Sequence, residues 1–401
     1  MLKRVFKAFH YRDFRILWMG ACTSSIGTWM QEIAQNWLVL QLTNSPFLLS
    51  IDAFLGDIPI FLFSLVGGVL ADRVDRRFIL IGSQVVQMLS ATTLAILVAT
   101  NHVQIWHVFC LSFVVGTAQS FGGPAYSALV PSLVSKEDVP NAIALNSIQF
   151  NLARVIGPVV GGLAMKYVGS AWCFGLNALS FLAVIVSLLR LDINFSPPHT
   201  GESVLTSMKQ GFRFIGTKAA MVPLILIAFC MTFLAFPMIV FLPVFAKIVF
   251  ARDAMTYTLF MASSGIGSIT GALTVAWLGD IKNKGRIALS ALVAMGIGMV
   301  CFSQSRSIPL SCVMLFFTGS MLMLAFTMIS SLVQLITPND MRGRVMSVYM
   351  VAFRGGMPFG ELLTGSLVAK LTAPTVLSIN GLVLAVLGLY YLLVQRKVAE
   401  L

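Results

Sequence analysis

Long apolar runs separated by short polar stretches follow one another along the whole 401-residue chain. Each run is about 20 residues or longer, the length that a helix needs to cross a hydrocarbon layer of about 30 Å. The pattern predicts twelve membrane-spanning helices over residues 14–42, 47–71, 78–99, 103–131, 141–168, 171–191, 219–247, 254–278, 286–304, 308–334, 344–369 and 373–395.

The longest polar stretch, residues 192–218, lies at mid-chain. It predicts a linker between an N-terminal six-helix bundle, residues 1–191, and a C-terminal six-helix bundle, residues 219–401. We therefore predict an all-α membrane protein with twelve transmembrane helices in two pseudo-symmetric six-helix bundles.

An internal repeat supports two similar halves. The stretch FNLARVIGPVVGG at 150–162 aligns with MVAFRGGMPFGEL at 350–362, which places Arg154 over Arg354 at a spacing near 200 residues. Two halves of like topology predict a substrate site at the midplane between them.

Composition supports a membrane protein, since 58% of the residues are apolar and 10% are charged. Soluble domains are about 45–50% apolar and about 25% charged. The net charge of +12 comes from Lys and Arg in short loops, so topology explains it better than a nucleic-acid partner does. Twenty of the 27 Lys and Arg residues lie at the termini and in the even-numbered loops, against five in the odd-numbered loops. Both termini and the linker are therefore predicted to be cytoplasmic, in an inner (plasma) membrane protein.

No pattern in the sequence indicates an enzyme. The six cysteines lie in apolar runs without metal-ligand or disulfide spacing, and no phosphate-binding G-x-x-x-x-G-K-[ST] occurs. We expect no catalytic constellation, no metal and no cofactor. A proton gradient is the expected source of energy, and a monomer is the expected state.

The stretch GGVLADRVDRR at 67–77 concentrates charge between two apolar runs. Its glycines would let two helices approach closely, and an acid there can meet an arginine or the positive end of a helix. The residues predicted to form this cytoplasmic latch motif are Gly68, Asp72, Arg73, Arg76 and Arg77. The simpler interpretation is that the arginines only anchor the loop on the cytoplasmic side.

In these residues the chain resembles the major facilitator superfamily, whose loop after the second helix has the pattern G-x-L-A-D-R-x-G-R-R/K. Asp75 replaces the second glycine of that pattern. The stretch RVIGPVVGG resembles the fifth-helix motif G-P-x-x-G-G of proton-driven exporters. The matching residues are Gly157, Pro158, Gly161 and Gly162.

HYRDFRILWMG at 10–20 and MRGRVMSVYMVAFRGGMP at 341–358 resemble the branch that contains the enterobactin exporter and macrolide-efflux-like transporters. The resemblance covers essentially the whole chain. It implies drug:proton antiport, with the latch motif closing the cytoplasmic side. The proline of the fifth-helix motif would act as a hinge or shape a tight interface, or it is an inert membrane proline.

Ionisable side chains inside the predicted helices need an explanation, because each costs about 2.5–3.5 kcal/mol at mid-bilayer. The candidates for proton coupling or cation binding are Glu32, Asp57 and Asp52. The alternative is a structural ion pair, for example with Arg154. Arg354 and Glu361 share a helix face two turns apart and are predicted to form a gating or inter-helix pair, with Arg154 the better candidate for a functional arginine.

Family analogy places the cavity wall on the first, fourth, seventh and tenth helices. The cavity candidates are Gln31, Gln35, Gln119, Ser120, Tyr126, Phe233, Phe236, Met238, Met323, Phe326 and Ser330, with Glu361 from the eleventh helix. Methionine and phenylalanine surfaces suit varied hydrophobic ligands.

The sequence therefore predicts a secondary active transporter that exports a small amphipathic organic compound, such as a drug, macrolide or siderophore, in exchange for protons. A lipid or lysolipid flippase and an importer are alternatives on the same fold. A non-transporting membrane receptor is a remote alternative, because it would need a sizeable soluble module.

Overall fold

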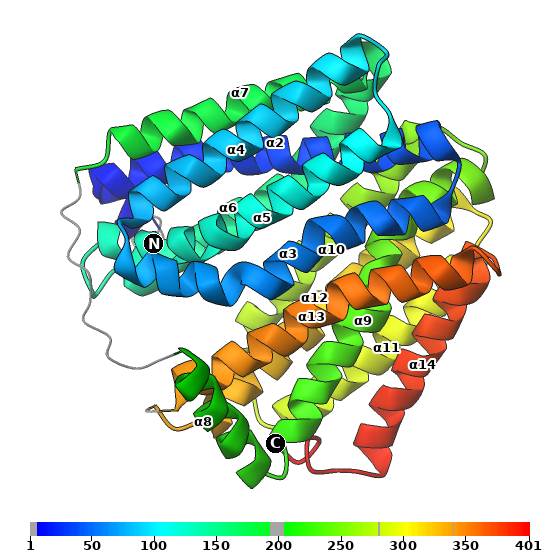
Figure 1. The fold of residues 1–401 in the computed structure, drawn as a ribbon. Coiled ribbons are helices and arrows are strands. Elements are labelled where there is room, and N and C mark those ends of the chain that lie inside the picture. Colours follow the sequence, from blue (N-terminus) through cyan, green and yellow to red (C-terminus); the bar gives the residue numbers. More distant parts are fainter. Residues whose placement is uncertain (1–5, 193–203, 280, 340) are drawn as a thin grey trace. The chain divides into compact units, whose positions relative to one another are not determined.

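The structure is a computed structural model that describes residues 6–192, 204–279, 281–339 and 341–401. Nearly all of these residues lie in helices (Figure 1). Parts of the predicted N-terminal bundle and linker, residues 1–5 and 193–203, lie outside the described residues. The chain divides into two compact units, Met1–Asn44 with Leu55–Thr200 and Ser45–Phe54 with Gly201–Leu401.

The long helices begin and end within three residues of the positions that the hydropathy pattern predicts. The N-terminal half contains η1 (Lys7–His10), α2 (Arg12–Thr43), α3 (Pro46–Arg73), α4 (Arg76–Ala99), α5 (Ile105–Leu129), η2 (Val130–Leu133), α6 (Val139–Tyr167) and α7 (Ser170–Leu189). The C-terminal half contains α8 (Val204–Thr217), α9 (Met221–Val244), η3 (Phe245–Val249), α10 (Ala254–Leu278), α11 (Lys284–Gln304), α12 (Ile308–Ile336), α13 (Arg342–Val368) and α14 (Ala373–Leu393).

Among the described helices, ten are long and apolar enough to cross a membrane. Helices α2 and α13 are long enough but less apolar, because α2 carries Glu32 among several Gln and Asn side chains and α13 carries Arg354 and Glu361. These two helices hold Glu32, Arg354 and Glu361, three of the charged residues that the sequence analysis selected.

Helix α8 lies within residues 192–218, the stretch predicted to link the two bundles. Residues Val204–Thr217 form an amphipathic helix whose Ile215 is buried. A Cβ added at Gly211 would lie 2.6 Å from the carbonyl oxygen of Arg344, so the glycine lets α8 pack closely on the start of α13. The hydropathy pattern missed this helix because it is short and lies among polar residues.

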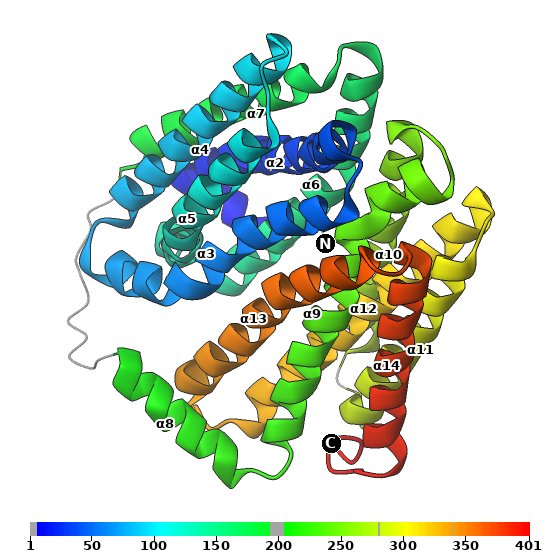
Figure 2. The same cartoon turned by 45° about the vertical axis from the view of Figure 1, so that its right-hand side comes forward.

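The two units share one scheme of helix pairing. In the first unit α2 packs against α6 and α7, and α4 packs against α5 and α7. In the second unit α9 packs against α13 and α14, and α11 packs against α12 and α14 (Figure 2). The internal repeat therefore extends from the motif residues to the order in which helices pack.

Glycines make the corresponding contacts in each unit. On α6, Gly157 and Gly161 lie against the backbone of α2, and on α13, Gly356 and Gly360 lie against the backbone of α9. Small residues at such contacts allow two helix backbones to approach closely. The core at one end of the first unit, which we call the linker end because α7 finishes there, is filled by apolar side chains including Phe14, Leu17, Leu80, Leu129 and Leu188.

Replacing Gly157 by alanine should destabilise the protein. The added Cβ would lie 2.5 Å from the Cβ of Trp29 and 2.8 Å from the carbonyl oxygen of Ile26, and overpacking of this kind costs about 1–3 kcal/mol. Thermal melting of the detergent-solubilised protein should show a midpoint several degrees lower.

The matched control is Gly175→Ala on α7, where an added Cβ meets no described atom within 4 Å. This variant should melt at the wild-type temperature or slightly above it, since alanine favours the helix. Equal melting temperatures for the two variants would contradict the proposed contact.

Candidate functional site

Three of the charged residues predicted from the sequence come together in the first unit. Glu32 of α2 interacts electrostatically with Asp57 of α3 and with Arg154 of α6. The Glu32 side chain is exposed, whereas those of Asp57 and Arg154 are half-buried. We call Glu32, Asp57 and Arg154 the acid–arginine group.

The fifth-helix motif positions Arg154 within this group. Gly157 and Gly161 face α2, and the Arg154 guanidinium carbon lies 5.7 Å from the centre of the Trp29 ring. Trp29 in turn meets Phe150 edge to face, with ring centres 5.9 Å apart. A cation over an indole face is attracted by the ring's quadrupole. The remaining motif residues, Pro158 and Gly162, are buried, and α6 continues through the proline without interruption.

Arg354 occupies a different place from Arg154, although the repeat aligns the two. The glycines that contact α9 are Gly356 and Gly360, one residue out of register with the alignment. At about 100° per residue, Arg354 lies about 140° from its helix's glycine face, against about 40° for Arg154. Arg354 is exposed on α13. The two arginines that the repeat aligns therefore have different surroundings.

Asp52 and Glu361 lie in the second unit, in which residues 45–54 pack against α13. Ser50 contacts Gly365, and the rings of Phe54 and Phe359 are 6.5 Å apart. Asp52 and Glu361 are 3% and 4% exposed. Asp52 therefore belongs to the second unit and Asp57 to the first, so α3 contributes its two acids to different units.

Two of the polar cavity candidates on α2 bond to neighbouring helices. Gln31 accepts a hydrogen bond from the amide of Asn177 on α7 at 2.7 Å, so it joins two helices. Gln35 donates to Ser112 of α5 at 2.9 Å. Because α2 turns by about 100° per residue, Gln31 and Glu32 point in different directions.

The cavity candidates of α5 have different surroundings. Gln119 is exposed, whereas Ser120 is buried and donates to the carbonyl of Thr117. Tyr126 is half-buried and donates from its hydroxyl to Asn146 of α6 at 2.7 Å.

The aromatic candidates of the second unit meet through a residue that the sequence analysis did not select. The Phe353 ring lies 4.9 Å from Phe326 and 5.9 Å from Phe236, measured between ring centres. These three rings, which we call the aromatic cluster, come from α13, α12 and α9. Phe353 could have been selected from the sequence because it directly precedes Arg354 in the internal repeat.

The latch motif supports the linker end of the first unit. Arg76 donates to the carbonyl of Ala128 at the end of α5, and lies 3.8 Å from Asp72. Arg77 donates to the carbonyls of Leu189 and Leu191 at the end of α7. Cations at these helix ends satisfy carbonyls that have no partner within their own helix.

Three details differ from the expected latch motif. A Cβ at Gly67 would collide with the Ser120 carbonyl of α5, whereas one at Gly68 meets no described atom within 4 Å, so Gly67 makes the close approach. Arg73 is exposed. Asp75, which departs from the family pattern, caps α4 by accepting a hydrogen bond from the Arg77 amide at 2.9 Å.

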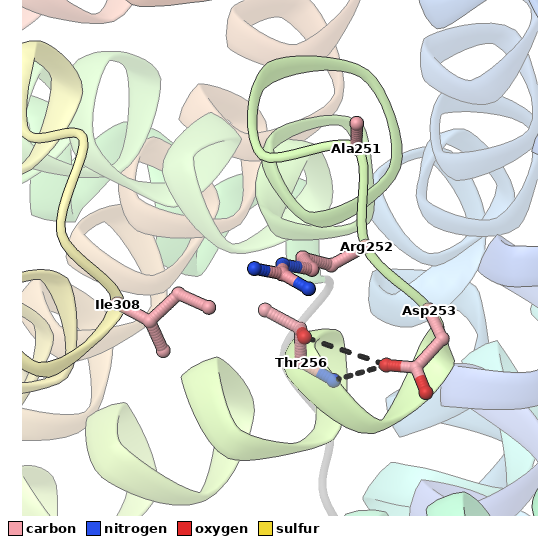
Figure 3. Close-up of a pocket in the computed structure, with 5 residues that line it drawn as sticks. All are labelled: Ala251, Arg252, Asp253, Thr256 and Ile308. Carbon is pink, nitrogen blue, oxygen red and sulfur yellow. Dashed lines mark hydrogen bonds between the residues drawn. The ribbon is translucent and has the colours of Figure 1, made fainter.

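A separate hollow of about 560 Å³ lies in the second unit, where α10 and α12 begin. Figure 3 shows Arg252 pointing into it, and Asp253 capping α10 through Thr256. The carboxylate of Asp253 already caps α10. None of the residues that line this hollow was predicted as a site residue.

Comparison with known proteins identifies the class of molecule. The chain matches the family of transmembrane secretion effectors of the major facilitator superfamily over residues 4–400, and it belongs to this family. It is therefore a multi-pass membrane transporter and not an enzyme.

Curated relatives include enterobactin exporters named EntS. The exporter of Shigella boydii is 26% identical over 385 residues, which cover 95% of this chain and 91% of the relative. That of Salmonella typhimurium is 25% identical over 383 residues, covering 95% and 92%.

Solved structures share the fold at low identity. A POT family transporter in complex with a thioalcohol-conjugated peptide has a TM-score of 0.76 at 12% identity and 96% coverage of both chains. A D-xylose-proton symporter has a TM-score of 0.75 at 13% identity, covering 95% of this chain and 97% of the other.

The N-terminal segment is tied to the start of α6 by a charged cluster. The Lys7 ammonium lies 2.7 Å from the Asp138 carboxylate, which also accepts a hydrogen bond from the Tyr11 hydroxyl at 2.9 Å. The hydrogen bond from Lys7 holds the pKa of Asp138 below its usual value of 3.8, and Asp138 raises the pKa of Lys7 above 10.5.

Asp138→Asn should therefore lower the melting temperature at pH 7. A carboxyl whose pKa is lowered by folding stabilises the fold at any pH above its pKa in the unfolded chain. This stabilisation is lost as the pH falls through the pKa of the carboxyl in the folded protein. The difference between variant and wild type should shrink below about pH 4. A difference that stays constant down to pH 3 would contradict a role for the charge of Asp138.

Proposed function

We propose that this transporter exports a small amphipathic organic compound across the inner membrane in exchange for protons. Ten candidate spans together with α2 and α13 supply twelve membrane-spanning helices, arranged as two six-helix bundles that alternate access to the substrate. The distribution of Lys and Arg supports cytoplasmic termini and a cytoplasmic linker.

The acid–arginine group is the observation that carries the coupling proposal. Two carboxylates and one guanidinium have a net charge of −1 when both acids are ionised, and one added proton makes the group neutral. Charge is costly at membrane depth, so a group that gains and loses one proton responds to its access to water. A membrane potential of 100 mV supplies about 2.3 kcal/mol for each charge moved.

The relatives support export of an organic compound, since those with 25–26% identity are named enterobactin exporters. The aromatic cluster offers stacking surface to a ligand with rings. A siderophore-like or macrolide-like compound is therefore the proposed cargo.

Import is the second candidate, and one observation favours it. The structural neighbours include a D-xylose-proton symporter, in which sugar and proton move in the same direction. The direction of coupled flow separates the two: an exporter accumulates the compound in vesicles whose interior is acidic, and a symporter accumulates it when the exterior is acidic.

Glu32→Gln should abolish transport driven by a pH gradient, because glutamine cannot gain or lose a proton. The test uses proteoliposomes with an acidic interior and external enterobactin, erythromycin or ethidium as probes. Wild-type protein should accumulate at least one probe until the gradient is collapsed.

Glu400→Gln is the matched control, since Glu400 is exposed near the end of the chain. It should transport at the wild-type rate, and both variants should insert and melt like wild type. Gradient-driven accumulation that survives in Glu32→Gln would remove Glu32 from the mechanism.

A further inference from the structure

A second hollow lies on α12 and α13, both of which belong to the second unit. It is a groove of about 390 Å³ beside the connection from α12 to α13. The lining includes Phe326, Thr327, Ser330, Ser331 and Gln334 of α12 and Arg342 of α13. The charge pattern predicts that this connection is cytoplasmic, so the groove would be open to the compartment from which an exporter collects its cargo.

One wall of the groove is polar. Thr327, Ser330, Ser331 and Gln334 are spaced three and four residues apart, which places them on one face of α12. The Gln334 amide donates to the Ser330 hydroxyl at 3.4 Å. The Thr327 hydroxyl donates to the carbonyl of Met323 in its own helix at 2.8 Å, whereas the Gln334 amide can also bond outside the helix. An amide on a membrane-spanning helix is expected to face water or a polar ligand, because lipid offers it no hydrogen bonds.

The inner end of the groove is aromatic. Phe326 lines it and belongs to the aromatic cluster, in which Phe353 also contacts Phe236 of α9. Phe326 and Phe236 are half-buried, so part of each ring remains accessible. A planar ligand entering the groove would therefore meet a ring on which to stack.

Among the described residues that line the groove, Arg342 carries the one charged side chain. Arg342, the first residue of α13, is exposed, and none of the described residues that line the groove is acidic. It also lies at the positive end of the α13 dipole, which favours an anion.

We propose that this groove captures the cargo on the cytoplasmic side, and that it selects an aromatic compound bearing an anionic group. Phe326 supplies the stacking surface, Arg342 the attraction for the anion, and the face of α12 from Thr327 to Gln334 the hydrogen bonds. The direction of capture rests on the proposed export function. The preference for an aromatic anion rests on the groove alone.

Binding of two matched probes to the purified full-length protein tests this preference without any gradient. The probes are 2-naphthoate and its uncharged isostere 2-naphthamide, and binding is followed by ligand-observed NMR at low salt. Wild-type protein should bind the naphthoate saturably and about fivefold more tightly than the amide, as an exposed ion pair allows. Raising the salt to 0.5 M should remove most of that difference.

Arg342→Gln should abolish the difference between the two probes, and Phe326→Ala should weaken both by about threefold to tenfold. Arg286→Gln, an exposed arginine near the start of α11 in the same unit, is the control and should bind like wild type. Absent saturable binding, or an unchanged preference in Arg342→Gln, would overturn the proposal. Because Glu32 plays no part in this assay, failure here is distinct from failure of the coupling mechanism.

Discussion

The close packing of α6 on α2 is the contact on which the candidate site depends. Gly157 and Gly161 lie against the backbone of α2 between Ile26 and Ile33, and this approach brings Arg154 over Trp29 and near Glu32. A larger residue at either glycine would separate the helices and move the arginine away from its acid. The fifth-helix motif thus has a structural role that directly serves the arrangement of charge.

The same packing scheme in the second unit leads to different chemistry. Gly356 and Gly360 bring α13 onto α9 in the same way, but the one-residue change in register turns Arg354 away from this contact. The first unit groups Glu32, Asp57 and Arg154, whereas the second holds the buried acids Asp52 and Glu361 together with the aromatic cluster. The same packing scheme therefore carries different side chains in the two units.

Much of the fold follows from the sequence, because a membrane span must be long and apolar. The helix ends and the family motifs were accessible in this way, and a pairing of Glu32 with Arg154 was the alternative to proton coupling. Helix α8 was not predicted because it is short and amphipathic. The partners of Gln31 and Gln35 were not predicted because a polar spacing does not identify the neighbouring helix. The roles of Gly67 and Asp75 depend on contacts with α5 and with the backbone of α4, which no local pattern reveals.

The proposed coupling requires the face of α2 around Glu32 to meet water from opposite sides of the membrane in turn. Thr28 is exposed and lies one turn before Glu32. Replacing Thr28 therefore probes this face without changing Glu32. The most direct measurement labels Thr28→Cys with a membrane-impermeant maleimide in right-side-out and inside-out vesicles, with mass spectrometry resolving each cysteine. Alternating access predicts labelling from both sides, with the favoured side reversed by the pH gradient. Labelling from one side only, whatever the gradient, would contradict it.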